Sequence, residues 1–136
     1  MNKYIDYELP PFERASDFAA WNRYAAVNDE FIPIHMDDEA GRAAGFQSAF
    51  GMGNLQVAYL HAVLREWMQD EGRVMSLTCQ MRAPNLRGTL TTATGKIIKV
   101  SDEGDDTVVE IEVATRTEDG TILSQGVAKV AFANVQ

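Results

Sequence analysis

Two adjacent carboxylates lie five and six residues before a histidine, and together these side chains could activate a water molecule. They are Asp29, Glu30 and His35, within the segment that begins at Tyr24. Pro33 stiffens the chain between the carboxylates and the histidine. A carboxylate and an imidazole that share one water can pass its protons, which is general acid–base catalysis. This segment is therefore the first candidate for chemistry.

Length, composition and charge limit the class of protein. The 136 residues suggest one domain, and 46% hydrophobic and 24% charged residues are ordinary for a soluble globular protein. The net charge of −8 argues against a nucleic-acid partner, although a few local basic residues could still hold an anionic ligand. A single cysteine, no signal-like segment and no membrane-length apolar run lead us to expect a cytoplasmic protein without a membrane partner.

The first half of the chain reads as mostly helical. Phe18, Trp21 and Ala25 recur at helical spacing, and the stretch from 55 to 64 is apolar on nearly every side, as in a buried helix. The expected elements are an edge strand over residues 1–9 ended by Pro10-Pro11, a helix from the N-cap Ser16 to about Val27, a loop over 28–36, a short helix from Asp37 or Asp38 to about Gly45, and a long helix that opens near Gly51–Gly53 and closes at Gly72.

From residue 74 onward the apolar period changes to two, which is the pattern of half-buried strands. Asp119-Gly120 is a strong hairpin signal. Short connections imply antiparallel pairing. The expected strands cover residues 74–82, about 89–100, about 109–113 and about 121–132, with Met75, Leu77, Cys79 and Met81 pointing inward in the first of them.

The order of elements predicts an α+β domain over residues 1–136. In the simplest packing, the long apolar helix lies across the concave face of a curved antiparallel sheet. Such a sheet has an exposed edge, which a second chain could cover, so we expect a dimer.

The segment from Tyr24 to His35 resembles the active-site motif of the MaoC-like dehydratases, a family with the hot-dog fold. The family includes (R)-specific enoyl-CoA hydratases and hydroxyacyl-thioester dehydratases. Its motif is an aromatic residue, alanine, two free positions, a small residue, glycine, aspartate, a free position, asparagine, proline, an aliphatic residue and histidine. In this chain the start is matched by Tyr24-Ala25 and the end by Pro33-Ile34-His35.

Laid without gaps, the middle of the motif is occupied by the following residues of this chain. Asn28 takes the small-residue position, Asp29 that of the glycine, Glu30 that of the catalytic aspartate and Ile32 that of the asparagine. Glutamate keeps the carboxylate but adds a methylene, and Asp29 offers a second carboxylate if the loop shifts by one residue.

The resemblance continues beyond the motif, from about residue 18 to 132. Gly53 falls where the family has the glycine that starts its central helix. The remaining similar stretches are Asp37-Asp38-Glu39, Ala44-Gly45-Phe46, Arg82-Ala83-Pro84 and Gly88-Thr89-Leu90.

The resemblance implies an (R)-specific enoyl-thioester hydratase or 3-hydroxyacyl-thioester dehydratase in fatty-acid metabolism. Its substrate would be an acyl-CoA or acyl-carrier thioester. Glu30 or Asp29 would hold the water with His35, and the backbone N–H of Gly53 would stabilise the oxyanion. The implied partner is a second copy or another hot-dog chain. No cofactor is implied, and no histidine pair has metal-ligand spacing, so we expect no metal.

Two other functions stay open. The substitutions at Glu30 and Ile32 allow a non-catalytic subunit of a hetero-oligomeric hydratase, and the fold also allows an acyl-CoA thioesterase. Of the other residues with chemical potential, we expect His61 in the core or an interface, Cys79 buried and inert, and Trp21 and Trp67 in packing. Candidates for holding the phosphates of a carrier are Arg73, Arg82, Arg87, Lys96 and Lys99.

Overall fold

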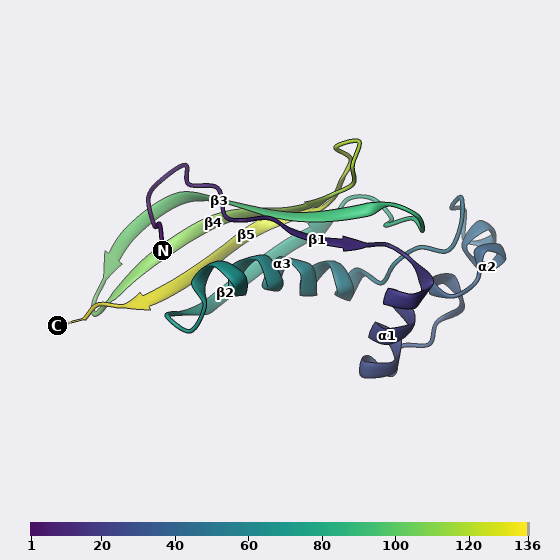
Figure 1. Cartoon of the computed structure of the whole chain (residues 1–136), viewed down its shortest axis with the longest axis horizontal. Coiled ribbons are helices and arrows are strands. Elements are labelled where there is room, and N and C mark those ends of the chain that lie inside the picture. Colours follow the sequence, from purple (N-terminus) through teal and green to yellow (C-terminus); the bar gives the residue numbers. More distant parts are fainter. Residues whose placement is uncertain (136) are drawn as a thin grey trace.

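The computed structural model describes residues 1–135 and shows a curved antiparallel sheet that wraps one long helix (Figure 1). The strand order in the sheet is β1-β3-β4-β5-β2. The predicted α+β fold, with a long helix on the concave face of the sheet, is confirmed. The elements are β1 Phe12–Ala15, α1 Phe18–Asn28, the 3₁₀ turn η1 Pro33–His35, α2 Asp38–Ala43, α3 Gly53–Met68, β2 Gly72–Met81, β3 Leu90–Glu103, β4 Asp106–Arg116 and β5 Ile122–Ala133.

The core lies between α3 and the concave face of the sheet. The side chains of Leu60, Val63 and Leu64 on α3 are fully buried, and Ile97 and Ile111 meet them from β3 and β4. The opposite face of α3 stays open, with Ala58 exposed and His61 and Ala62 half-buried. The sequence predicted a helix buried on all sides, and within one chain only one side is covered.

The long helix ends earlier than predicted. Its C-cap is Gln69, whose positive φ of 51° breaks the helical path, and Gly72 is already the first residue of β2. A Cβ at Gly72 would lie 2.8 Å from the Phe132 ring, so this glycine permits close packing against β5 and does not close the helix.

In β2 the predicted alternation of inward side chains is interrupted by a bulge between Val74 and Ser76. The extra residue turns Met75 outward, where it is 51% exposed, while Val74 packs against the core. Leu77 and Cys79 do face the core, and Cys79 is half-buried as a free thiol.

The N-terminal strand is also displaced from its prediction. Proline has no N–H to donate to a neighbouring strand, so the strand begins only after Pro10-Pro11. β1 then pairs antiparallel with β3. The cap of α1 is Asp17, which accepts from Ala20 N at 2.8 Å. Ser16, the predicted cap, is buried instead.

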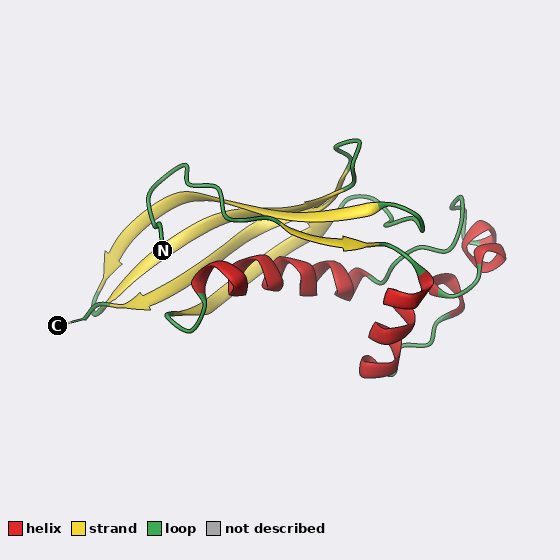
Figure 2. Cartoon of the chain, in the orientation of Figure 1, coloured by secondary structure: helices red, strands yellow, loops and turns green. Residues whose placement is uncertain are grey.

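The short elements α1, η1 and α2 gather at the end of the sheet where α3 begins (Figure 2). The short helix predicted near Asp37 is confirmed as α2, with Asp37 accepting from Glu39 N at 3.2 Å as its N-cap. The four candidate catalytic residues, Asp29, Glu30, His35 and Gly53, therefore lie in this helical end or at the first turn of α3. Among residues 1–135, no helix is long and apolar enough to cross a membrane.

Candidate active site

The candidate loop begins with a residue in the left-handed helical conformation. Asp29 is the C-cap of α1, with φ 52° and ψ 43°, and its N–H donates to the carbonyl of Ala25. Only glycine adopts this conformation without a Cβ penalty, which gives a physical reason for glycine at this place in the motif. This conformation supports the ungapped alignment, in which Glu30 and not Asp29 follows the cap as the carboxylate. The side chain of Asp29 is exposed.

Replacing Asp29 with glycine is expected to stabilise the fold by about 1 kcal/mol, because it removes the left-handed strain and a negative charge at a helix C-terminus. Chemical denaturation would measure the free energy of unfolding. The matched control is Asn28→Gly, which puts glycine in the last helical residue and should destabilise the protein. Equal destabilisation by both changes would contradict this account of Asp29.

Glu30 is half-buried beside Tyr24. Burial is the main cause that raises the pKa of the Tyr24 phenol, and the negative charge of Glu30 is the second. Neither Glu30 nor Asp29 hydrogen-bonds His35 within residues 1–135. The three side chains that the sequence grouped thus share a loop without a direct bond between carboxylate and imidazole.

His35 is held firmly by the segment that leads to α3. It is 6% exposed, its Nδ1 lies 2.7 Å from the carbonyl oxygen of Phe50, and its ring meets the Phe50 ring edge-on at 5.4 Å. Phe50 N donates in turn to the carbonyl of Ile34 at 3.1 Å. A carbonyl can only accept, so Nδ1 carries the hydrogen and Nε2 of the neutral ring has the free lone pair.

Nε2 of His35 is placed to accept a proton. It has no hydrogen-bond partner within residues 1–135, and it is not among the polar atoms of this part of the chain that are both fully buried and unpartnered. It therefore keeps some solvent access, as a general base needs for contact with water.

Asp38 fixes the position of the segment that holds His35. Its carboxylate accepts from Ala49 N at 3.1 Å and forms an ion pair with Arg87. The bond from Ala49 N is the largest cause that lowers the pKa of Asp38, and the bond from Arg87 is the next. α2 and the turn after β2 are thereby both tied to the residue that precedes Phe50.

Because the pKa of Asp38 is lower in the folded protein, its contribution to stability is present above its unfolded pKa, near 3.8, and is lost as pH falls through the folded value. We expect Asp38→Asn to destabilise the protein at pH 7, and the difference from wild type to shrink in acid. Denaturation at neutral and acid pH measures this. Glu39→Gln, on the same helix, is the control and should show no such convergence; a pH-independent effect of Asp38→Asn would contradict the assignment.

Gly53 is the first residue of α3, and the space around it is open. It is exposed, a Cβ there would meet nothing within 4 Å, and Met52 as N-cap supplies no side-chain hydrogen bond. The first N–H groups of a helix have no intrahelical acceptor, and the helix dipole favours negative charge there. The N–H of Gly53 is thus available to an oxygen atom of a ligand.

A cavity of about 360 Å³ lies at this N-terminus of α3. Phe50 lines it, and the same residue holds His35 through its carbonyl, so this short segment connects the histidine to the cavity that contains Gly53. A hydrogen bond of 2.8 Å from Gly51 N to the Asn85 carbonyl joins two of its lining residues. The full lining is Phe46, Phe50, Gly51, Gly53, Gln56, Met81, Arg82, Ala83, Pro84 and Asn85.

Of these lining residues, the sequence had singled out only Gly53 and Arg82 for chemistry. Gln56 does have a signal in the sequence: it is the one amide inside the apolar stretch of 55 to 64. Phe50 and Asn85 carried no local signal, and Phe46 was only part of a stretch that is similar to the family. Only the folding of the chain brings these residues into one cavity with Gly53.

The five basic residues proposed for phosphate binding are now separated into two groups. Four of them form ion pairs, Arg73 with Asp106, Arg87 with Asp38, Lys96 with Asp6 and Lys99 with Glu110. The guanidinium of Arg82 bonds to the neutral amides of Gln80 and, in the latter's favoured orientation, Gln125; it has no carboxylate partner within residues 1–135, and it lines the cavity with Gly53.

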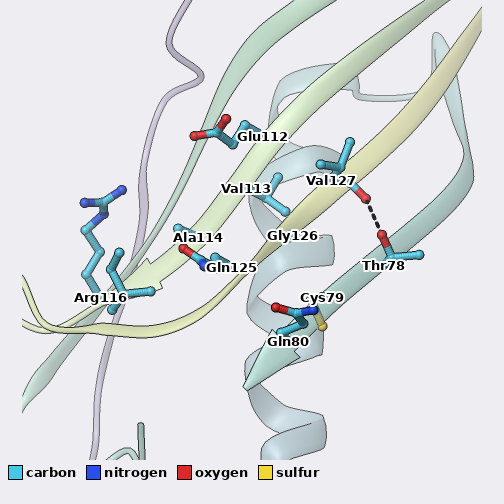
Figure 3. Close-up of a pocket in the computed structure, with 11 residues that line it drawn as sticks. Thr78, Cys79, Gln80, Glu112, Val113, Ala114, Arg116, Gln125, Gly126 and Val127 are labelled. Atoms are coloured by element: carbon cyan, nitrogen blue, oxygen red, sulfur yellow. Dashed lines mark hydrogen bonds between the residues drawn. The ribbon is translucent and has the colours of Figure 1, made fainter. Parts of the chain in front are cut away.

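A larger hollow of about 620 Å³ lies on the sheet (Figure 3). Its lining side chains Glu112, Ala114 and Arg116 alternate along β4 with the buried Val113 and Thr115, so they belong to the face that points away from α3. None of the predicted site residues reaches it. Of the four predicted catalytic residues, only Gly53 lines the smaller cavity at α3, and His35 is bonded to Phe50 in its wall; we therefore take that cavity as the candidate site. Within residues 1–135 no group of three or more His, Cys, Asp or Glu side chains could hold a metal ion.

Comparison with known proteins gives the fold a name. No family model and no curated protein matches the sequence. Solved structures do match: an (R)-hydratase from A. caviae involved in PHA biosynthesis has a TM-score of 0.82 at 16% identity, covering 93% of this chain and 95% of that one. The chain has a hot-dog fold.

Two further structures give the same result. A MaoC-like dehydratase from Rhodospirillum rubrum matches with a TM-score of 0.81 at 17% identity over 98% of this chain and 94% of that one. The ChsH1-ChsH2 complex from Mycobacterium tuberculosis matches with a TM-score of 0.84 at 16% identity over 95% and 98%. The resemblance predicted from the sequence is thus confirmed at the level of the hot-dog fold.

Proposed function

We propose that this hot-dog protein is an (R)-specific enoyl-thioester hydratase, working in reverse as a 3-hydroxyacyl-thioester dehydratase. One observation carries the proposal: the carbonyl of Phe50 holds Nδ1 of His35 at 2.7 Å, and the chain then runs directly to Gly53 at the open N-terminus of α3. In this proposal His35 is the base for water, the N–H of Gly53 is the donor for a thioester oxygen, and residues 50–53 link the two. The solved structures with this fold include (R)-hydratases and dehydratases, which supports this reading.

In the proposed reaction, the π bond between C2 and C3 of the enoyl thioester breaks. Nε2 of His35 takes a proton from water as the water oxygen bonds to C3, and the electron pair moves to the thioester oxygen. The N–H of Gly53 donates to that oxygen. The proton that His35 took then bonds to C2, either directly or by relay through the carboxylate, and the carbonyl re-forms.

We assign the carboxylate to Glu30. It is half-buried and directly follows the left-handed cap, as the motif's aspartate follows its glycine, whereas Asp29 is the cap itself and is exposed. Glu30 would hold the other hydrogen of the water that His35 deprotonates.

The cavity wall supports the proposed substrate class. Phe46, Phe50, Met81 and Pro84 offer apolar surface to an acyl or pantetheine chain. Arg82 at the same cavity lacks a carboxylate partner among residues 1–135 and could meet a phosphate of CoA or of an acyl carrier.

A partner chain is part of the proposal. β2 pairs with β5 on one side only, and the uncovered side of α3 exposes Ala58 beside the half-buried His61. A second copy, or a different hot-dog chain as in the ChsH1-ChsH2 and HadBC complexes, would cover both.

A non-catalytic subunit of a two-chain hydratase is the second candidate. Two observations favour it: no hydrogen bond joins Glu30 to His35 within residues 1–135, and Ile32, 42% exposed, takes the place of the motif's asparagine. Such a subunit would supply part of a substrate tunnel to an active partner.

The deciding experiment incubates the purified protein with crotonyl-CoA and longer enoyl-CoAs and follows the loss of enoyl absorbance. We expect turnover by the chain alone. Silence alone, followed by turnover when a related hot-dog chain is added, would favour the non-catalytic subunit. Release of free CoA thiol would instead indicate a thioesterase.

A further inference from the structure

Gln56 is a buried amide without partners. It is 3% exposed, and neither Nε2 nor Oε1 has a hydrogen bond within residues 1–135. Burial of an unpaired amide costs free energy, and most buried polar groups in proteins are satisfied. Gln56 also lines the cavity at the N-terminus of α3. A polar group with this cost, in the wall of a cavity, points to a ligand as its partner.

The position of Gln56 in the helix directs its side chain to Gly53. Gln56 follows Gly53 by three residues, so both lie on one face of the first turn of α3. Helical side chains lean toward the N-terminus, which carries the Gln56 amide over that turn. The amide, which is buried in the unliganded chain, and the free N–H of Gly53 therefore lie on the same side of the cavity, where a change of the Gln56 rotamer would bring the amide beside the N–H.

The groups at this end of the cavity favour a ligand with an oxygen atom that accepts hydrogen bonds. The N-terminus of α3 favours negative charge, and Gly53 offers a hydrogen-bond donor. The neighbouring wall, with Phe46, Met81 and Pro84, is apolar and suits an uncharged chain better than a free anion. A carbonyl oxygen attached to an apolar chain satisfies both conditions.

We propose that Nε2 of Gln56 is a second donor to the thioester carbonyl oxygen, beside the N–H of Gly53. The inference rests on the proposed function and adds a residue to its oxyanion site. Two donors would share the negative charge that this oxygen gains when water adds to C3. Asn85 also lines the cavity and its Nδ2 is unpartnered within residues 1–135, but its Oδ1 already accepts from Ser16 and Thr91, whereas both amide atoms of Gln56 are unpartnered.

The test compares two ligands in the full-length protein. Butyryl-CoA is a saturated thioester that cannot be hydrated, and S-butyl-CoA is a thioether that lacks the carbonyl oxygen. Calorimetry measures the affinity of each for wild type, Gln56→Leu and the size-matched Gln56→Glu. We expect both variants to weaken butyryl-CoA binding about fivefold or more, the effect of one neutral hydrogen bond, and to leave S-butyl-CoA unchanged.

Thermal unfolding supplies the second readout. Gln56→Leu removes an unpaired buried amide, so we expect its melting temperature to equal or exceed that of wild type. A lower melting temperature with loss of an oligomer on gel filtration would mean that a second chain satisfies Gln56 and would overturn the inference. Equal weakening of both ligands, or no weakening of butyryl-CoA, would also overturn it.

Failure of the inference can be told from failure of the proposed function. If wild type binds butyryl-CoA and the variants lose only that ligand, the inference stands even when crotonyl-CoA is not hydrated. If wild type hydrates crotonyl-CoA but the variants bind both ligands as wild type does, only the role of Gln56 is wrong. If wild type binds neither ligand, both proposals are wrong.

Discussion

Replacing His35 with asparagine is expected to lower the rate of crotonyl-CoA hydration by about 10²–10⁴-fold, the usual loss when a general acid–base is removed. The asparagine Nδ2 occupies nearly the place of Nδ1 and can still donate to the Phe50 carbonyl, which accepts from His35 at 2.7 Å. Nε2 has no counterpart in asparagine. The variant thus separates the chemistry of His35 from its structural bond.

The controls use the same measurements. His61→Asn changes the only other histidine, which lies on the uncovered side of α3, and should keep wild-type turnover. His35→Ala should lose both turnover and thermal stability, because the Phe50 carbonyl also loses its donor. Full activity in His35→Asn, with an unchanged melting temperature, would remove His35 from the mechanism.

Replacing Glu30 with glutamine is expected to lower hydration by about 10²–10⁴-fold, because the amide keeps the size of the side chain but cannot carry the proton. Steady-state kinetics with crotonyl-CoA measure the effect. The loss should fall on kcat more than on KM, since Glu30 acts on the water and not on the acyl chain.

Two neighbouring changes make this result specific to Glu30. Asp29→Asn alters the adjacent carboxylate at the exposed cap, and Glu39→Gln alters an exposed glutamate on α2. Both should retain most of the activity. A large loss in Asp29→Asn with none in Glu30→Gln would reverse the assignment and would mean that the loop acts one residue out of the ungapped register.

Local signals in the sequence predicted most of the fold. Gly120 adopts a positive φ of 87° in the turn before β5, as the Asp119-Gly120 hairpin signal required. The predictions were wrong where contacts between residues far apart in the sequence determine the local structure. Gly72 looks like a helix terminator in the sequence, but its role is to make room for the Phe132 ring.

The bulge in β2 was also invisible to the sequence. Alternation predicts that Met75 points inward, and only the register of β2 against β5 shows the extra residue that turns it outward. Register depends on pairing between segments about fifty residues apart, which the period of one strand does not contain.

The candidate site was predicted in part. The sequence proposed His35, Glu30, Asp29 and Gly53 as site residues and grouped His35 with the carboxylates, whereas in the structure His35 contacts the backbone of Phe50. Backbone acceptors have no sequence signature. Gln56 was different, because a lone amide in an apolar helix is a visible anomaly, and its burial gives that anomaly a meaning.

The most direct test of the central claim is to run crotonyl-CoA hydration by the chain in D₂O and to analyse the product by mass spectrometry and chiral chromatography. Addition of water by the proposed groups predicts (R)-3-hydroxybutyryl-CoA with one deuterium on C2, made by wild type and lost in His35→Asn. Unchanged crotonyl-CoA, free CoA, or a product without a preferred configuration would contradict it.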